Sequence, residues 1–161
     1  MDEGTEVQGH RRWVGTTSEG EAAIGRIAIW AAAVEDNLVH LCAFLINSTD
    51  ADVGHAVTEN MSASATIQLA KKLVTDSKRV SAQDAAELLE MLTEAKAALE
   101  QRNRILHATV GEIMIEGKTV FFNRRRMRQG DAATLHGVEE LDEIGARLFR
   151  VSEDLWGCLN N

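Results

Sequence analysis

Residues 81–107, SAQDAAELLEMLTEAKAALEQRNRILH, show the most regular apolar spacing in the chain and decide the fold class. Ser81 begins the pattern, and Asp84 three residues later completes a helix-capping pair. Seven positions then recur at intervals of three and four residues, which is the spacing of one face of an α-helix. This pattern predicts a long amphipathic helix that ends at Gly111. Six of the seven positions are apolar and one is an arginine: Ala85, Leu88, Leu92, Ala95, Leu99, Arg102 and Leu106.

Helical spacing recurs on both sides of this segment. Ser18, with Glu21 as a capping box, is predicted to begin a first helix that ends at residues 47–50. A less regular helical stretch follows, with breaks expected at Gly54 and at residues 58–60. A last helix is expected from Val138. The apolar positions of the three stretches are Ile24, Ile27, Ala31, Val34, Leu38, Leu41 and Leu45; Ile67, Ala70, Leu73 and Val74; and Val138, Leu141, Ile144, Leu148, Val151, Leu155 and Leu159.

The predicted fold is all-α: an up-and-down bundle of four to five helices with a small β-hairpin inserted before the last helix. The hairpin is expected at about residues 112–123, where two β-prone runs flank the turn sequence Glu-Gly-Lys. Residues 1–17 have no periodicity and are interpreted as a mobile tail. The remaining residues, 18–161, are predicted to form a single helical domain, because a chain of 161 residues suits one compact core.

Composition excludes several classes of protein. No apolar run comes close to the roughly 20 residues that span a bilayer, so we expect no membrane segment. The N-terminus is acidic and lacks the apolar core of a signal peptide. Cys42 and Cys158 are isolated, so no disulfide framework is predicted and a cytoplasmic location is expected. The five histidines show no metal-binding spacing, and we predict neither a metal nor a cofactor.

The positive charge is concentrated in one segment. The whole chain has a net charge of −8, but residues 102–128 hold seven basic side chains and only two acidic ones. An acidic protein does not attract polyanions indiscriminately. Functional residues are therefore sought in this segment.

Arg102 opens the basic segment from within the apolar stripe. Because each helical residue turns 100°, Asn103 and His107 share a face, whereas Arg102 points about 140° away from His107. Burying an unpaired guanidinium among apolar neighbours costs on the order of several kcal/mol of free energy, as for other buried charges. It must meet a carboxylate, carbonyl groups, a partner subunit or an anionic ligand. Glu35, beside the stripe of the first helix, is the candidate for a purely structural pair, and His107 can equally be a helix cap.

The sequence Arg102-Asn103-x-x-x-His107, at the end of a long amphipathic helix, resembles the signature of the HEPN-domain superfamily. That superfamily includes prokaryotic toxin ribonucleases and RNA-cleaving domains of CRISPR effectors. The resemblance covers the helix order over about residues 18–159. It implies that Arg102, Asn103 and His107 are catalytic and that Glu35 supports them. Toxin-type members often carry a tyrosine two residues after the histidine, and here that position is Thr109.

The resemblance implies metal-independent cleavage of RNA, in which the ribose 2′-hydroxyl attacks the adjacent phosphorus. His107 would act as general base or acid, and Arg102 would stabilise the phosphorane. Since one motif supplies one histidine for two roles, a homodimer is expected. An antitoxin or regulatory protein is a further expected partner. The alternative hypothesis is a non-catalytic helical module that recognises a protein or nucleotide, with Arg102 structural.

The arginines that follow the hairpin allow two interpretations. They are predicted either to guide RNA through its phosphates, together with Arg104, or to be charges that protect a strand edge. No aromatic residues are interleaved with them, so sequence-specific readout is not indicated. A nucleic-acid-binding accessory protein is a third, minor hypothesis. The residues concerned are Arg124, Arg125, Arg126 and Arg128.

Overall fold

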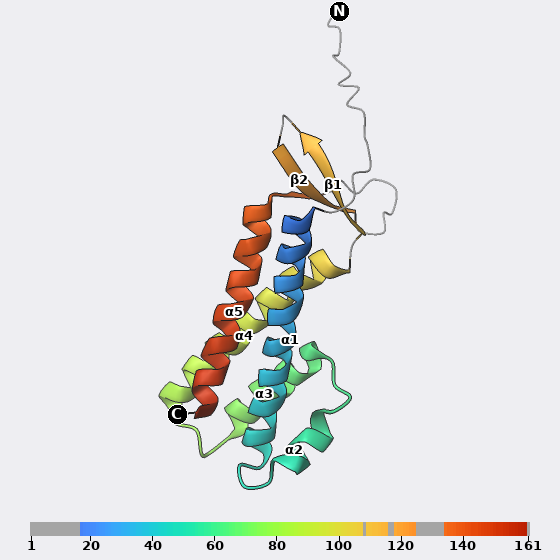
Figure 1. Ribbon diagram of the computed structural model, residues 1–161. Helices are drawn as coiled ribbons and strands as arrows, with labels where there is room; N and C mark the ends of the chain where they lie inside the picture. The colour runs from blue at the N-terminus through green and yellow to red at the C-terminus, as the bar shows by residue number, and fades with distance from the viewer. Residues whose placement is uncertain (1–16, 108, 116–117, 125–133, 161) are drawn as a thin grey trace, which may run out of the picture.

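The computed structural model describes residues 17–107, 109–115, 118–124 and 134–160. These residues form five helices, and the predicted all-α bundle is confirmed. Helices α1, α4 and α5 run along the length of the molecule, and α2 and α3 lie at the end away from the strands (Figure 1). The predicted tail, apart from Thr17, lies outside the described residues. The helices are α1 (Ser18–Ile46), α2 (Ala51–Thr58), α3 (Ala63–Asp76), α4 (Ala82–Leu106) and α5 (Val138–Asn160).

Helix α1 is the central element of the bundle and contacts α2, α3, α4 and α5. It begins at Ser18, as predicted, but the capping residue is Thr17 and not Ser18: the Thr17 Oγ1 atom accepts a hydrogen bond of 3.3 Å from the Gly20 amide. The helix ends at Ile46, as the polar run after it predicted. One face carries most of the apolar stripe into the core: Ala23, Ile27, Ala31, Val34, Leu38 and Leu41.

Gly54 was predicted to interrupt the helix, but it lies inside α2 and does not interrupt it. A Cβ atom at this position would lie 2.2 Å from the Cα of Ala43, well inside van der Waals contact. Glycine is therefore required where α2 crosses α1 closely. The actual break comes after Thr58, as the polar residues there predicted, and Ser62 then caps α3 by accepting a hydrogen bond of 3.3 Å from Ala65.

Helix α4 begins as predicted. The hydroxyl of Ser81 accepts a hydrogen bond of 3.1 Å from the Asp84 amide and donates one of 2.8 Å to its carboxylate. The helix ends at Leu106 and not at Gly111, so the predicted end was wrong. The residues that follow, from Thr109, belong to strand β1, where the β-branched Thr109 and Val110 favour extended backbone.

Three strands adjoin the end of the bundle at which α4 ends and α5 begins (Figure 1). They form an antiparallel sheet in the order β1-β2-β3, and the register pairs Thr109 with Arg124. Strand β3 was not predicted. The turn of the expected hairpin, residues 116–117, lies outside the described residues, so the closed hairpin stays a prediction. The strands are β1 (Thr109–Ile115), β2 (Lys118–Arg124) and β3 (Thr134–His136).

One apolar core joins α1, α3, α4 and α5. Helix α5 supplies its predicted stripe, with Leu141, Leu148 and Leu155 essentially inaccessible to solvent. A buried polar link also joins α1 and α5, because the amide of Asn37 on α1 donates to the carbonyl (3.0 Å) and hydroxyl (3.1 Å) oxygens of Ser152 on α5. This link satisfies a buried amide and fixes the register of the two helices.

Helix α1 is long and apolar enough to cross a membrane by length and composition, which the sequence analysis did not anticipate. Its most apolar 18-residue window has a mean hydropathy of 1.5, and 39% of that window is buried inside the protein. The alanines on its outer side raise the mean hydropathy without forming a run of large apolar residues. The buried side of the same helix forms a large part of the core.

Candidate functional site

Arg102 projects from the last two turns of α4 towards α1. Its Nη2 atom forms an ion pair with Oε1 of Glu35, and its Nη1 atom donates a hydrogen bond of 2.8 Å to Oδ1 of Asn103. The side chain is 15% exposed. As predicted from its position in the apolar stripe, this guanidinium lies at the edge of the core and meets a carboxylate of the first helix.

The ion pair of Arg102 is open on one side. Only one oxygen of Glu35 contacts the guanidinium, and the Glu35 side chain is 42% exposed. The Nε atom of Arg102 is buried and has no hydrogen-bond partner. A buried donor without a partner costs about 1–3 kcal/mol. Within the described residues, the guanidinium therefore has a donor that no partner uses.

His107 lies immediately after the last residue of α4 and is exposed. Its backbone amide still donates to the carbonyl of Asn103, at 3.2 Å, so the helical geometry extends to this amide. The imidazole has no hydrogen bond or ion pair within the described part of the chain. The structure therefore brings Arg102, Asn103 and His107 to one end of α4, with the arginine turned inward and the histidine turned to solvent.

Asn103 is bonded to the guanidinium and not to the imidazole. Its amide oxygen accepts from Arg102, which leaves the amide nitrogen for another partner. Because the C-terminal end of a helix carries partial negative charge, the backbone here does not attract an anion. Any phosphate at this end of α4 must be held by side chains.

The strand register places further basic residues at the same end. Arg124 is the partner of Thr109 in the sheet, and Thr109 is only two residues beyond His107. Arg104 is exposed on α4, as predicted. The side chains of Thr109 and Arg124 are outside the description, as are the whole of Arg125, Arg126 and Arg128. The arginine segment therefore begins beside the candidate site, and its phosphate contacts stay a prediction.

A second feature was missed by the sequence analysis. Arg147 of α5 binds both carboxylate oxygens of Glu94 on α4, at 2.6 and 3.0 Å, and also donates to Gln101 at 2.9 Å. The guanidinium lowers the pKa of Glu94, and the carboxylate raises the pKa of Arg147. The sequence shows that Glu94 belongs to a series of acidic residues along α4. It does not show that Arg147 of α5 is its partner.

The two cysteines differ in environment. Cys42 is buried, and burial raises the pKa of its thiol to about 11. Cys158 is exposed near the end of α5, and its pKa is raised by desolvation and by the nearby carboxylates of Asp154, Glu87 and Asp84. No group of three or more metal-binding side chains occurs among the described residues.

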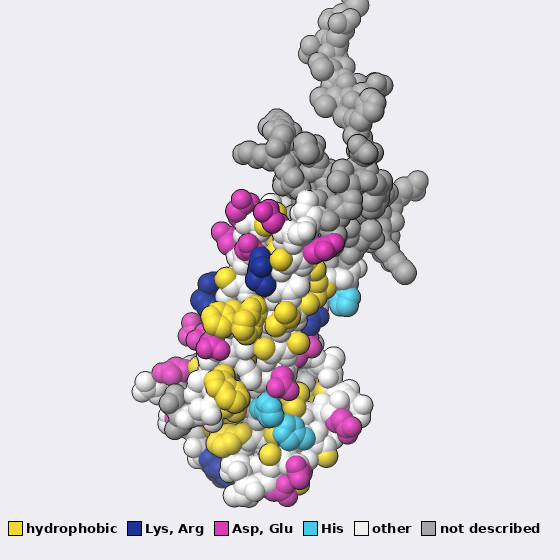
Figure 2. Space-filling view, viewed as in Figure 1, with side chains coloured by type: hydrophobic (Ala, Val, Ile, Leu, Met, Phe, Trp, Pro, Cys, Tyr) yellow, Lys and Arg dark blue, Asp and Glu magenta, His cyan; other side chains and the backbone are white. Residues whose placement is uncertain are grey.

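Aromatic side chains reach the surface along the neighbouring helices α1 and α5. Trp30 and Phe149 pack edge to face with ring centroids 4.6 Å apart, and Phe44 and Trp156 are about half exposed. Figure 2 shows apolar side chains gathered along this face of the molecule.

Comparisons with protein-family models, with curated proteins and with solved structures find no match for this chain.

Proposed function

We propose that this protein is a metal-independent endoribonuclease of HEPN type, a toxin or defence effector that cleaves RNA at the C-terminal end of α4. One observation carries the proposal: the guanidinium of Arg102 is held at the edge of the core by Glu35 and Asn103, has a Nε atom without a partner among the described residues, and belongs to the same end of α4 as the exposed His107. These are the residues whose spacing resembles the HEPN motif.

The chemistry proposed for this site is a transesterification. The ribose 2′-oxygen forms a bond to the adjacent phosphorus, and the bond from phosphorus to the 5′-oxygen of the next nucleotide breaks. A histidine accepts the 2′-hydroxyl proton, and a second acid protonates the leaving 5′-oxygen. Arg102 stabilises the charge of the phosphorane through its planar donors. The products are a 2′,3′-cyclic phosphate and a 5′-hydroxyl.

The two proton transfers support the proposal of a homodimer. The motif supplies one histidine, His107, and the reaction needs two groups with different protonation states. His136 of β3 lies at the same end of the bundle, but its Nδ1 atom is paired with Oε1 of Glu140 at 3.0 Å. A two-fold axis beside α4 supplies the second His107. The arginine segment that starts at Arg124 would hold the RNA backbone at the same end, with the closed hairpin over 112–123 as its support.

A second function has its own supporting observation. The Arg102–Glu35 ion pair is formed within one chain, as a structural role for Arg102 requires. The alternative is therefore a non-catalytic module that recognises a protein or nucleotide partner. A cytoplasmic location and a regulatory antitoxin partner belong to the ribonuclease proposal and not to this one.

The test is to incubate the purified protein with mixed RNA in the presence of a chelator and to identify the new ends. We expect 2′,3′-cyclic phosphate and 5′-hydroxyl ends. The same sample in sedimentation velocity is expected to contain a dimer. Absence of cleavage supports the binding module, whereas cleavage by a strictly monomeric species contradicts the two-fold arrangement.

A further inference from the structure

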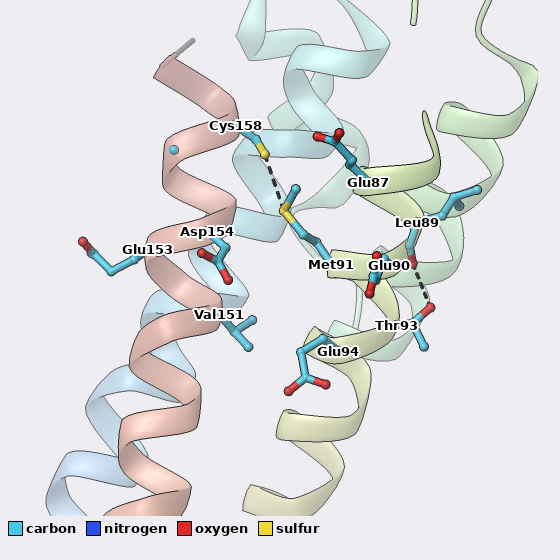
Figure 3. A pocket seen from close by; sticks show the side chains of 11 residues that line it. Glu87, Leu89, Glu90, Met91, Thr93, Glu94, Val151, Glu153, Asp154 and Cys158 are labelled. Carbon is cyan, nitrogen blue, oxygen red and sulfur yellow. Dashed lines mark hydrogen bonds between the residues drawn. The ribbon is translucent and has the colours of Figure 1, made fainter. Parts of the chain in front are cut away.

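A groove of about 1100 Å³ runs between the N-terminal half of α4 and the C-terminal half of α5. It is separate from the candidate site, which lies at the other end of α4. Side chains from both helices face it, and those of Met91 and Cys158 point towards each other across it (Figure 3). The groove is open to solvent along its length, so a segment of another molecule has access to it.

The floor of the groove is apolar. Leu89 and Met91 of α4 and Val151 of α5 line it, together with Gly157 and Cys158. The Cys158 thiol donates to the Met91 sulfur at 3.5 Å. Methionine is flexible and polarisable, so it adapts to apolar side chains of different shapes. Gly157 has no neighbouring atom within 4 Å of the place where a Cβ would lie, which leaves free space above the floor.

The walls of the groove are acidic on both sides. Glu87, Glu90 and Glu94 project from α4, and Asp154 projects from α5 towards α4 (Figure 3). Glu153 of α5 also borders the groove, but its side chain points away from α4. Of these five carboxylates, only Glu94 has an ion pair within the described part of the chain, and it is made with Arg147. The negative field reaches the floor, because Asp154 and Glu87 contribute to the raised pKa of Cys158.

This arrangement opposes the stability of α4. Glu87, Glu90 and Glu94 recur at intervals of three and four residues, and like charges at this spacing destabilise a helix by about 0.2–0.5 kcal/mol per pair. The facing carboxylate of Asp154 on α5 adds to the repulsion. A cationic partner in the groove relieves it, since each carboxylate then gains an opposite charge beside a surface of low dielectric constant.

We propose that this groove docks a basic amphipathic segment of a partner protein. The segment carries Lys or Arg side chains that pair with the acidic walls, and an apolar side chain that packs on Met91, Val151 and Cys158. Two features identify this partner chemistry: the charge complementarity of both walls and the apolar floor between them. The inference does not depend on the proposed ribonuclease activity, and the same negative charge keeps RNA away from this face.

The first test measures binding of an 18-residue probe peptide of Leu and Lys in amphipathic helical order, by titration calorimetry with the full chain. We expect saturable one-to-one binding. The Glu90→Lys/Asp154→Lys variant is expected to weaken it by tenfold or more, since it reverses one charge on each wall. The matched control, Glu59→Lys/Glu139→Lys, changes the net charge equally at exposed positions outside the groove and is expected to leave the affinity within twofold.

Two outcomes overturn the proposal. Equal weakening by the groove variant and the control shows that the peptide responds only to net charge. Equal affinity for a peptide of the same composition in scrambled order, or for spermine, shows that the groove attracts cations without using its floor. Circular dichroism of both variants establishes that a lost affinity does not come from unfolding.

The second test uses Cys158 as a reporter inside the groove. Cys42 is buried, so a thiol reagent is expected to modify one cysteine per folded chain. A saturating amount of the Leu/Lys peptide is expected to slow this modification by tenfold or more in the wild type, but not in the Glu90→Lys/Asp154→Lys variant at the same peptide concentration. An unchanged rate in the wild type at full saturation places the peptide elsewhere and contradicts the proposal.

Discussion

The two ends of α4 face different neighbours and carry opposite charge. Its N-terminal half, with Glu87, Glu90 and Glu94, borders α5 and an open acidic groove, whereas its C-terminal end places Arg102 against α1 and His107 in solvent. The apolar stripe runs continuously between the two ends. Core packing and surface chemistry are therefore encoded on separate faces of one helix, and they meet only where Arg102 occupies a core-facing position.

The position of the charge relative to the core distinguishes the two ends. The glutamates at the groove are exposed, and water solvates them at little cost. Arg102 is mostly removed from water, so it needs the partners that Glu35 and Asn103 provide. Arg104, two residues away on the same helix, is exposed. Substitutions at these two arginines therefore compare a mostly buried charge with an exposed one.

The largest difference is expected between Arg102→Ala and Arg104→Ala. Loss of Arg102 removes a donor to the phosphorane and is expected to lower RNA cleavage by about 10²-fold or more. Loss of Arg104 is expected to lower it by only a few-fold, through weaker attraction of phosphate. Initial rates on a labelled RNA measure both variants. Equal effects of the two substitutions would mean that Arg102 acts only as one more positive charge.

A smaller effect is expected for Glu35→Gln, which keeps the size of the side chain and removes its charge. The guanidinium then loses its anionic partner and its fixed orientation, and we expect cleavage to fall on the order of tenfold, the scale of a misplaced reacting group. Urea unfolding is expected to show a loss of about 1 kcal/mol. The matched control is Glu19→Gln, an exposed glutamate in the first turn of α1.

If Glu35→Gln lowers stability by several kcal/mol while cleavage by the folded fraction stays unchanged, the ion pair is structural. This result would favour the non-catalytic module. An increase in RNA affinity without cleavage would point the same way, because a guanidinium released from its carboxylate then simply binds phosphate.

The smallest effect is expected in the middle of α4, where Glu94 pairs with Arg147 of α5. Arg147→Gln is expected to lower the free energy of unfolding at pH 7 by up to about 1 kcal/mol, as for exposed ion pairs. Because the folded pKa of Glu94 is lowered, its stabilisation is present above the ordinary glutamate pKa and is lost as pH falls through the lowered value.

The difference in stability between wild type and Arg147→Gln is therefore expected to be constant above about pH 5 and to vanish at lower pH, given an ordinary glutamate pKa of about 4.3. Urea unfolding of both proteins across this range measures it. A difference that grows as the solution becomes more acidic would show that the pair does not stabilise the fold through the charged carboxylate.

The sequence predicted the helices where apolar spacing and capping residues agree. Ser81 and the polar residues after Ile46 mark helix ends through their own side chains, so these ends were predictable. Gly54 was misread because its reason is tertiary: it lies against the backbone of Ala43, a contact that no local pattern reveals. The end of α4 was misplaced because the β-branched Thr109 and Val110, directly before Gly111, favour a strand over a helix.

The candidate site was predictable only in part. The position of Arg102 in an apolar stripe requires a partner, and Glu35 follows from the geometry of the first helix. The bond from Arg102 to Asn103 and the free side of Glu35 depend on side-chain rotamers, which the sequence does not encode locally. The groove between α4 and α5 was not predicted because it depends on how two helices distant in sequence pack together.

The most direct measurement is the rate of RNA cleavage by His107→Ala beside that of His55→Ala, in the presence of a chelator. His55 lies on α2, whereas His107 follows the end of α4, so the pair controls for loss of any imidazole. The account predicts a loss of about 10²-fold or more for His107→Ala and an unchanged rate for His55→Ala. Cleavage by folded His107→Ala at the wild-type rate would contradict it.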